Sequence, residues 1–159
     1  MSDNPLVTKP ENPVSVNLEA VDGILERARF YREAGGFEIP TEHIFAKGLG
    51  VRMIVSPPGS TLISYVHKKE NVALILKGSV TIYEGDDRIT EMAAPQVFVT
   101  KPGTLRMVLC HDEVIWVTVH PTECDNRADF EAEVFGTAWT PDDYVRIAAE
   151  LGVPVPALN

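Results

Sequence analysis

The side chains best suited to chemistry lie in the segment SYVHKKENVALILKGSV, residues 64–80, and in a later segment, TKPGTLRM, residues 100–107. Tyr65 and His67 stand two residues apart, and Asn71 follows four residues after the histidine. Arg106 lies in the later segment. These four side chains supply many hydrogen-bond donors, and a guanidinium prefers planar oxyanions such as carboxylate or phosphate. One hypothesis is therefore a site for a small polar or anionic molecule.

The same four residues are a poor set of metal ligands. A divalent transition metal takes about three strong ligands, usually imidazole or carboxylate. Only His67 meets this need, because tyrosine and an asparagine carbonyl are weak ligands and Arg106 would repel a cation. His111 and His120 flank the last β-like run, one in a turn and one at a strand end, and are not expected to converge with His67. We therefore predict no metal site and no cofactor.

The elements that must hold these residues are mostly strands. From residue 43 to 122, short β-like runs alternate with turn residues, which predicts about nine strands in a sandwich or small barrel. A proline-containing arm, 1–17, and an amphipathic helix, 18–36, precede this region. A helical segment, 123–159, follows it, and within that segment TPDDYVRIAAELG has Thr140 as N-cap and Gly152 as stop signal.

The spacing of residues 59–78 resembles the first motif of the cupin family, G-x5-H-x-H-x3-4-E-x6-G. Gly59 opens the motif, Gly78 closes it, and His67 matches the second histidine. Tyr65 falls at the first histidine and Asn71 at the glutamate. Because a barrel strand alternates faces, Tyr65 and His67 are both expected to point into the barrel.

The second cupin motif, G-x5-P-x-G-x2-H-x3-N, matches more loosely. Gly103 falls at its inner glycine and Arg106 at its histidine. The resemblance implies a mainly β fold, a single cupin-type jelly-roll barrel with flanking N-terminal and C-terminal α-helices. The frame of the family's metal site is then present with His67 as its one strong ligand, and we interpret it as a frame that has lost its metal.

Charge and composition limit the classes of partner that the protein is expected to bind. The formal charge of −9 argues against nucleic acid or an anionic membrane as the main partner, since both require a basic face. The chain contains no run of 18 apolar residues, so no transmembrane helix is predicted, and the first residues do not resemble a signal peptide. Cys110 and Cys124 lack a zinc-like spacing and are expected to be reduced thiols, which predicts a cytoplasmic location.

Three functions remain open. The first, which we favour, is a metal-free cupin-fold protein that binds a small polar or anionic molecule through Tyr65, His67, Asn71 and Arg106. The second is a structural or assembly protein. The segment VTVHPTE, followed by an acidic helix, is similar to cupin-type proteins of bacteriophages. This resemblance would place the protein in the host cytoplasm or the virion. The third, implied by the cupin resemblance, is a metal-independent sugar isomerase or epimerase with His67 as base and Tyr65 as acid. A homodimer or higher oligomer is expected through an exposed edge strand.

Overall fold

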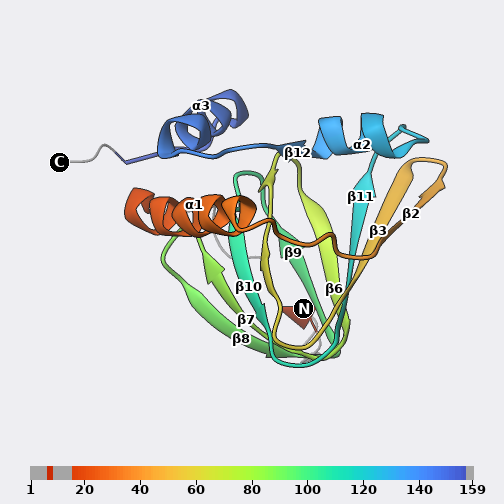
Figure 1. The fold of residues 1–159 in the computed structure, drawn as a ribbon. Coiled ribbons are helices and arrows are strands. Elements are labelled where there is room, and N and C mark those ends of the chain that lie inside the picture. Colours follow the sequence, from red (N-terminus) through yellow and green to blue (C-terminus); the bar gives the residue numbers. More distant parts are fainter. Residues whose placement is uncertain (1–6, 9–15, 157–159) are drawn as a thin grey trace.

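The computed structural model describes residues 7–8 and 16–156 of the chain (Figure 1). Three helices are present in this part: α1 (Leu18–Glu33), α2 (Arg127–Val134) and α3 (Pro141–Leu151). The strands are β1 (Val7–Thr8), β2 (Thr41–Ala46), β3 (Leu49–Ser56), β4 (Thr61–Ile63), β5 (Val66–His67), β6 (Asn71–Lys77), β7 (Ser79–Glu84), β8 (Ile89–Ala93), β9 (Gln96–Thr100), β10 (Arg106–Cys110), β11 (Val114–Pro121) and β12 (Phe135–Gly136). No helix in the described ranges is long and apolar enough to cross a membrane.

The strand order is that of a jelly roll. One sheet contains β9-β6-β11-β3 and the other contains β4-β10-β7-β8, so that the chain passes repeatedly from one sheet to the other. β2 extends the first sheet beside β3, and β1 pairs in parallel with β9 at its opposite edge. The predicted class, mainly β with a jelly-roll barrel and helices at both ends, is confirmed.

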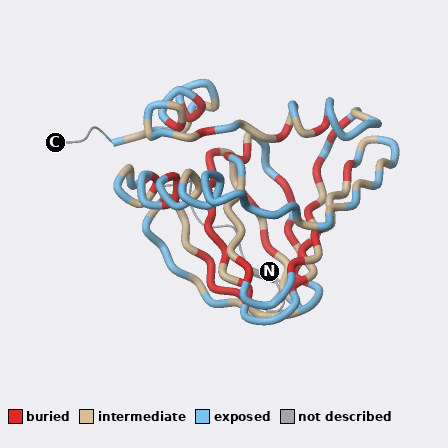
Figure 2. The backbone as a smooth tube through the Cα atoms, in the orientation of Figure 1, coloured by how far each residue is buried: buried red, intermediate tan, exposed pale blue. Residues whose placement is uncertain are grey.

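The barrel is packed shut only in the half away from the helices. Buried segments run along strands of both sheets (Figure 2). Their inward side chains form an apolar cluster: Ile54, Ala73, Ile75, Val80, Ile82, Phe98, Val108, Cys110, Val114 and Trp116. The inward residues of the same strands become polar toward the helical end, where Arg52, Thr118 and Arg106 follow Ile54, Trp116 and Val108. One half of the barrel is therefore a core, and the other half is able to form a site.

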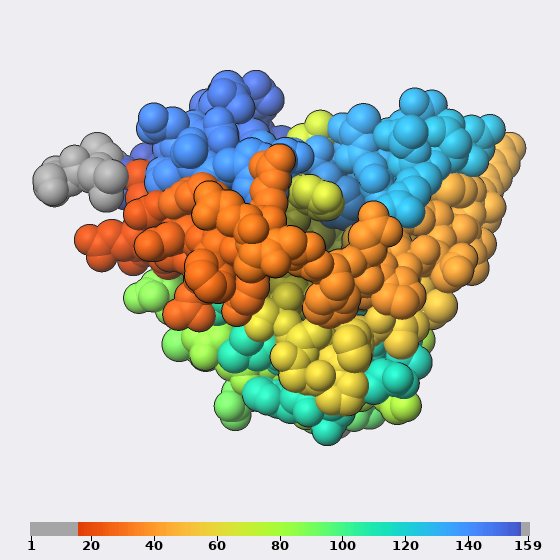
Figure 3. Space-filling view, viewed as in Figure 1, coloured from red at the N-terminus to blue at the C-terminus, as the bar shows by residue number. Residues whose placement is uncertain are grey.

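Helix α1 lies over the outer face of the four-stranded sheet. Val21, Ile24 and Leu25 pack with Met107 of β10 and with Tyr144 of α3 in a second apolar cluster. Figure 3 shows α1 and the segment after it lying across the strands on this side, with the C-terminal segment above them. Asn17 caps α1, and at α3 Thr140 and Asp143 form a capping box, as the sequence predicts for Thr140.

The motif glycines are required by backbone geometry. Gly59, Gly78 and Gly103 have φ values of 76°, 87° and 89°, a region that residues with a Cβ rarely adopt. The Gly103 N–H donates to the His67 carbonyl at 2.7 Å, and the His67 N–H donates to the Thr104 carbonyl at 3.0 Å. The turn before β10 is thus tied directly to His67, and this brings the two motif segments together.

Candidate functional site

A cavity of about 270 Å³ occupies the helical end of the barrel. Its polar lining comes from five strands or the segments beside them: Arg52 on β3, Thr61 on β4, Ser64, Tyr65 and His67 from the segment around β5, Arg106 on β10, and Thr118 on β11. Its apolar lining consists of Phe37, Ile39, Ile54, Leu62, Ile63, Val108, Trp116 and Phe135. The cavity therefore combines two guanidinium groups with a mainly aliphatic and aromatic wall.

Arg106, predicted from the sequence, is buried with 5% of its surface exposed. Its Nε lies 3.4 Å from Glu84 Oε1, on the neighbouring strand β7. Its guanidinium carbon lies 5.2 Å from the ring centre of Phe98 and 6.0 Å from that of Trp116. Burial lowers the pKa of Arg106 and the charge of Glu84 opposes this shift. The charge of Arg106 is thus balanced by an acid within the protein.

Arg52, which the sequence analysis missed, has no such acid. It lies opposite Thr118 on β11 and His43 on β2. Within the described residues its Nε is buried without a hydrogen-bond partner, and no ion pair involves its guanidinium. Its charge faces the Phe135 ring, whose centre lies 5.5 Å away. Burial lowers the pKa of Arg52, and the charge of Glu131 only partly opposes this shift without forming an ion pair. A guanidinium at a cavity wall without an ion-pair partner is a group that an anion would stabilise.

His67 and Asn71 lie together, as the motif resemblance implies. Both are buried, and Asn71 Nδ2 lies 3.4 Å from His67 Nδ1. Burial holds the pKa of His67 well below its ordinary value, and the charges of Arg106, His120 and Arg52 lower it further. His67 is therefore neutral near pH 7 and offers hydrogen bonds without a charge.

Tyr65 lines the cavity from the rim of the barrel and does not share the buried position of His67 that the alternation of faces predicts. The single strand expected over 61–67 is divided into β4 and β5, so that the alternation of faces does not continue through Ser64 and Tyr65. Tyr65 is 48% exposed and lies at the rim, with its ring centre 5.5 Å from that of Phe135. The structure thus brings together three of the four predicted residues and leaves the fourth at the entrance.

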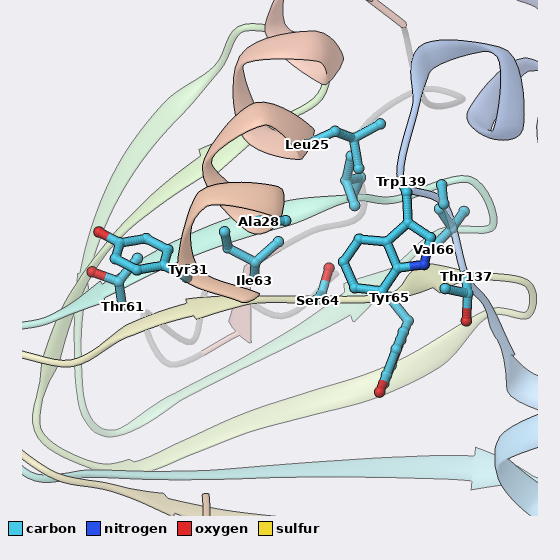
Figure 4. Close-up of a pocket in the computed structure, with 12 residues that line it drawn as sticks. Leu25, Ala28, Tyr31, Thr61, Ile63, Ser64, Tyr65, Val66, Thr137 and Trp139 are labelled. Carbon is cyan, nitrogen blue, oxygen red and sulfur yellow. The ribbon is translucent and has the colours of Figure 1, made fainter. Parts of the chain in front are cut away.

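A second cavity, of about 200 Å³, lies between α1 and β4 (Figure 4). Leu25 and Ala28 of α1 line it from one side, and Trp139 lines it from the C-terminal segment. Thr61, Ile63, Ser64 and Tyr65 line both cavities. Tyr65 therefore stands at the border between the barrel interior and the groove beneath α1.

His120 is a further buried group that the sequence analysis set aside. Its Nε2 lies 2.9 Å from Thr118 Oγ1, and its ring packs edge-on against Phe130 and Phe135. Burial, with the charges of Arg52 and His43, lowers its pKa to about 4. The signal that could have found both residues was a polar side chain at an inward position of a mainly apolar strand, GVRMIVS for Arg52 and VIWVTVH for His120.

The donor set does not fit a metal ion. Among the described residues no three His, Cys, Asp or Glu side chains cluster to hold one. The groups whose charges act on His67 are Arg106, Arg52 and His120, two of them cationic.

We expect the purified protein to contain no stoichiometric transition metal. Elemental analysis checks this: about one zinc, iron, manganese or nickel per chain, lost in a His67→Ala variant, would contradict it. A trace amount that is unchanged in that variant would agree with the expectation.

Comparisons with known proteins give similar solved structures but no match to a family model or to a curated protein. Similar solved structures include an RmlC-like cupin from Shewanella frigidimarina NCIMB 400, with 18% identity, 60% of this chain and 84% of that chain covered, and a TM-score of 0.48. Another is an uncharacterized double-stranded β-helix protein from Klebsiella pneumoniae subsp. pneumoniae MGH 78578, with 18% identity, 56% and 81% covered, and a TM-score of 0.48. A third is a cupin superfamily protein from Desulfitobacterium hafniense DCB-2, with 10% identity, 53% and 77% covered, and a TM-score of 0.46. These neighbours are cupin-like. The jelly-roll assignment itself rests on the strand order.

Proposed function

We propose that the barrel cavity binds a small molecule carrying a carboxylate or a similar planar oxyanion. The observation that carries this proposal is Arg52, a partly buried residue at the cavity wall whose Nε is buried without a hydrogen-bond partner and which forms no ion pair among the described residues. An unpaired buried charge is costly for a folded protein, and a bound anion removes that cost. Arg106, Thr118 and His67 line the same cavity and supply further donors.

The charge balance of the cavity favours an anion. Glu84 offsets one of the two guanidinium groups, and His67 is neutral near pH 7. Arg52 therefore remains as a positive charge without an ion-pair partner among the described residues, in a protein whose formal charge is −9. A local field of this sign raises the concentration of anions at the cavity, although the protein as a whole repels them.

The apolar wall defines the rest of the ligand. Trp116, Phe135, Ile54 and Val108 enclose the space in front of the guanidinium groups. Small-molecule sites are commonly apolar pockets with a few well-placed polar groups that fix orientation. We infer a small carboxylic acid with an aliphatic or aromatic body, oriented with its carboxylate on Arg52.

The test is a thermal-shift screen with matched pairs of compounds, each carboxylate compared with the neutral amide of the same body, for example benzoate with benzamide. A carboxylate at about one hundred times its dissociation constant stabilises the folded state by about 2.7 kcal/mol, which raises Tm by roughly 5–10 °C. The amide should give little shift. If no carboxylate in the panel raises Tm more than its amide does, the binding proposal fails and the scaffold function becomes the better hypothesis.

A further inference from the structure

The barrel cavity extends around strand β4 from its inner face to its outer face. Leu62 of β4 packs against the apolar cluster inside the barrel, whereas its neighbour Ile63 packs against the cluster beneath α1. Because side chains alternate along a strand, Thr61 belongs to the outer face together with Ile63. Thr61 and Ile63 nevertheless line the barrel cavity, as Leu62 does. The cavity is therefore not confined to the inside of the barrel.

This extension lies at an edge of the four-stranded sheet. Among the described strands β4 pairs only with β10, at one end of the order β4-β10-β7-β8, so its other edge has no strand beside it. Ser64, at the end of β4, is fixed toward β10, because its Oγ accepts a hydrogen bond from the Arg106 N–H at 2.9 Å. Four residues in and beside β4 line both cavities: Thr61, Ile63, Ser64 and Tyr65. The shared lining places the connection between the two cavities at this open edge.

The second cavity differs from the barrel cavity in its chemistry. Arg52 and Arg106 line the barrel cavity, whereas no charged side chain among the described residues lines the second one. Its wall is mainly apolar and includes Leu25, Ala28, Ile63, Leu105, Ala138 and Trp139. An ion would lose its hydration there without gaining a partner, whereas hydrocarbon would gain from leaving water. The second cavity therefore suits the uncharged part of a ligand.

Trp139 gives the second cavity a fixed wall (Figure 4). Its N–H donates to Asp143 Oδ2 at 3.0 Å, and its carbonyl accepts a hydrogen bond from Arg29 of α1. The guanidinium carbon of Arg32, also on α1, lies 4.2 Å from the centre of the indole ring. These contacts join the segment before α3 to helix α1. The cavity is thus formed without a ligand, and binding does not have to order this wall.

The volumes favour one ligand that occupies both cavities. Small-molecule sites typically enclose about 300–1,000 Å³. The barrel cavity, of about 270 Å³, is smaller than this, whereas the barrel cavity joined to the second cavity, of about 200 Å³, falls within the range. The positive charge is in the barrel, and the uncharged wall is beneath α1. A molecule with a carboxylate head and an extended hydrocarbon tail matches this division.

We propose that the second cavity is the tail site for the ligand of the barrel. An amphipathic carboxylic acid places its carboxylate on Arg52, passes the open edge of β4 beside Tyr65, and buries an aliphatic or aryl-alkyl tail between α1 and Trp139. This inference rests on the proposed function and adds to it the length of the ligand and the place of its apolar end. The site therefore selects long carboxylic acids over short ones.

The test is calorimetric titration with benzoate and with 6-phenylhexanoate, in which a chain of methylene groups separates the same ring and carboxylate, and with the neutral amide of each. The wild type should bind the long acid roughly thirty-fold or more tightly than benzoate, because the additional methylene groups are buried. Ala28→Phe fills the second cavity from α1 and should reduce this preference to about three-fold or less. If Ala28→Phe fails to fold, as judged by circular dichroism, Thr137→Phe fills the cavity from the C-terminal segment and should have the same effect.

Ala20→Phe is the matched control. Ala20 is also on α1 and partly buried, but it lines a separate cavity with Tyr83 of β7 and Ile89 of β8. This variant should keep the preference of the wild type for the long acid.

Tryptophan fluorescence gives a second measurement, since the chain contains two tryptophans and each cavity is lined by one of them, Trp116 in the barrel and Trp139 beneath α1. In a Trp116→Phe variant, the long acid should change the emission of Trp139, and benzoate should not.

The expected outcomes distinguish this inference from the proposed function. Suppose that at least one acid binds more tightly than its amide. The tail site is then overturned, and the proposed function stands, if the long acid has no preference over benzoate or if its preference persists in Ala28→Phe or Thr137→Phe. An equal loss of preference in Ala20→Phe also overturns the tail site. If neither acid binds more tightly than its amide, the proposed function fails and this inference fails with it.

Discussion

Replacing Arg52 by glutamine is expected to weaken the binding of a small carboxylate by at least a hundred-fold. A hundred-fold loss corresponds to about 2.7 kcal/mol, within the roughly 2–5 kcal/mol that removal of a charged group from a desolvated contact costs. The same substitution should leave the melting temperature of the ligand-free protein unchanged or raise it. The reason is that Arg52 forms no ion pair in the described structure and burial lowers its pKa, so its removal breaks no ion pair and relieves a desolvation cost.

Arg106→Gln provides the contrasting variant. Arg106 is paired with Glu84, and its removal leaves that carboxylate, 15% exposed, with only the more distant Arg88, 3.8 Å away. We expect the free energy of unfolding to fall by about 1–3 kcal/mol, because a buried ion pair that loses one member is destabilised. Calorimetric titration of both variants and thermal melts without ligand would distinguish a residue that binds the ligand from one that stabilises the fold.

Arg127→Gln is a suitable control, since this arginine is 61% exposed on α2 and lies outside the cavity lining. It should change neither affinity nor stability appreciably. Wild-type affinity in Arg52→Gln would contradict the assigned role of Arg52. A parallel loss of affinity and of melting temperature in that variant would also contradict it, because among the described residues Arg52 has no ion-pair partner that the substitution would leave unpaired.

The jelly roll was predictable because its signals are local. Positive-φ turns at Gly59, Gly78 and Gly103 require glycine, so their spacing is visible in the sequence before any contact is known. The caps of α3 are local in the same way, since Thr140 and Gly152 act on backbone groups within one turn. Three of the four predicted site residues are close to these turns, and their burial was predictable for that reason.

Tyr65 and Arg52 show where local reasoning stops. Tyr65 was expected inside because a continuous strand alternates faces, but the chain leaves the strand after Ile63 and resumes at Val66. Nothing in the letters TLISYVH marks that break. The importance of Arg52 depends on distant partners: it is next to Thr118 only because β3 pairs with β11, and the lack of an acid beside it is a property of three-dimensional packing.

The histidines make stability sensitive to mild acid. Burial lowers the pKa of His120 to about 4, and it also lowers the pKa of His67 and of His43. The groups around them are mainly cationic. The charge of Arg52 lowers the pKa of all three histidines, that of Arg106 lowers the pKa of His67, and that of Arg127 lowers the pKa of His43, where the charge of Glu131 partly opposes the shift. In the unfolded chain a histidine titrates near 6.5, so below that pH the unfolded state binds more protons than the folded state.

We therefore expect stability to be fully present above about pH 6.5 and to fall as the pH decreases toward about 4, with His120 alone contributing up to about 3 kcal/mol of this loss. A second, separate loss should appear only below pH 4.5, where Glu133 titrates in the unfolded chain. Hydrogen bonds from Cys124, Lys69 and Thr122 lower its pKa to about 2 in the folded protein. Urea unfolding at half-unit steps from pH 7.5 to 4 measures the first loss, and a His120→Gln variant, whose amide can still bond Thr118 Oγ1, should show a shallower decline over this range. If wild type and variant decline in parallel between pH 6.5 and 4.5, His120 is not held neutral by burial, and the uncharged state that we assign to the interior of the barrel is wrong for this residue.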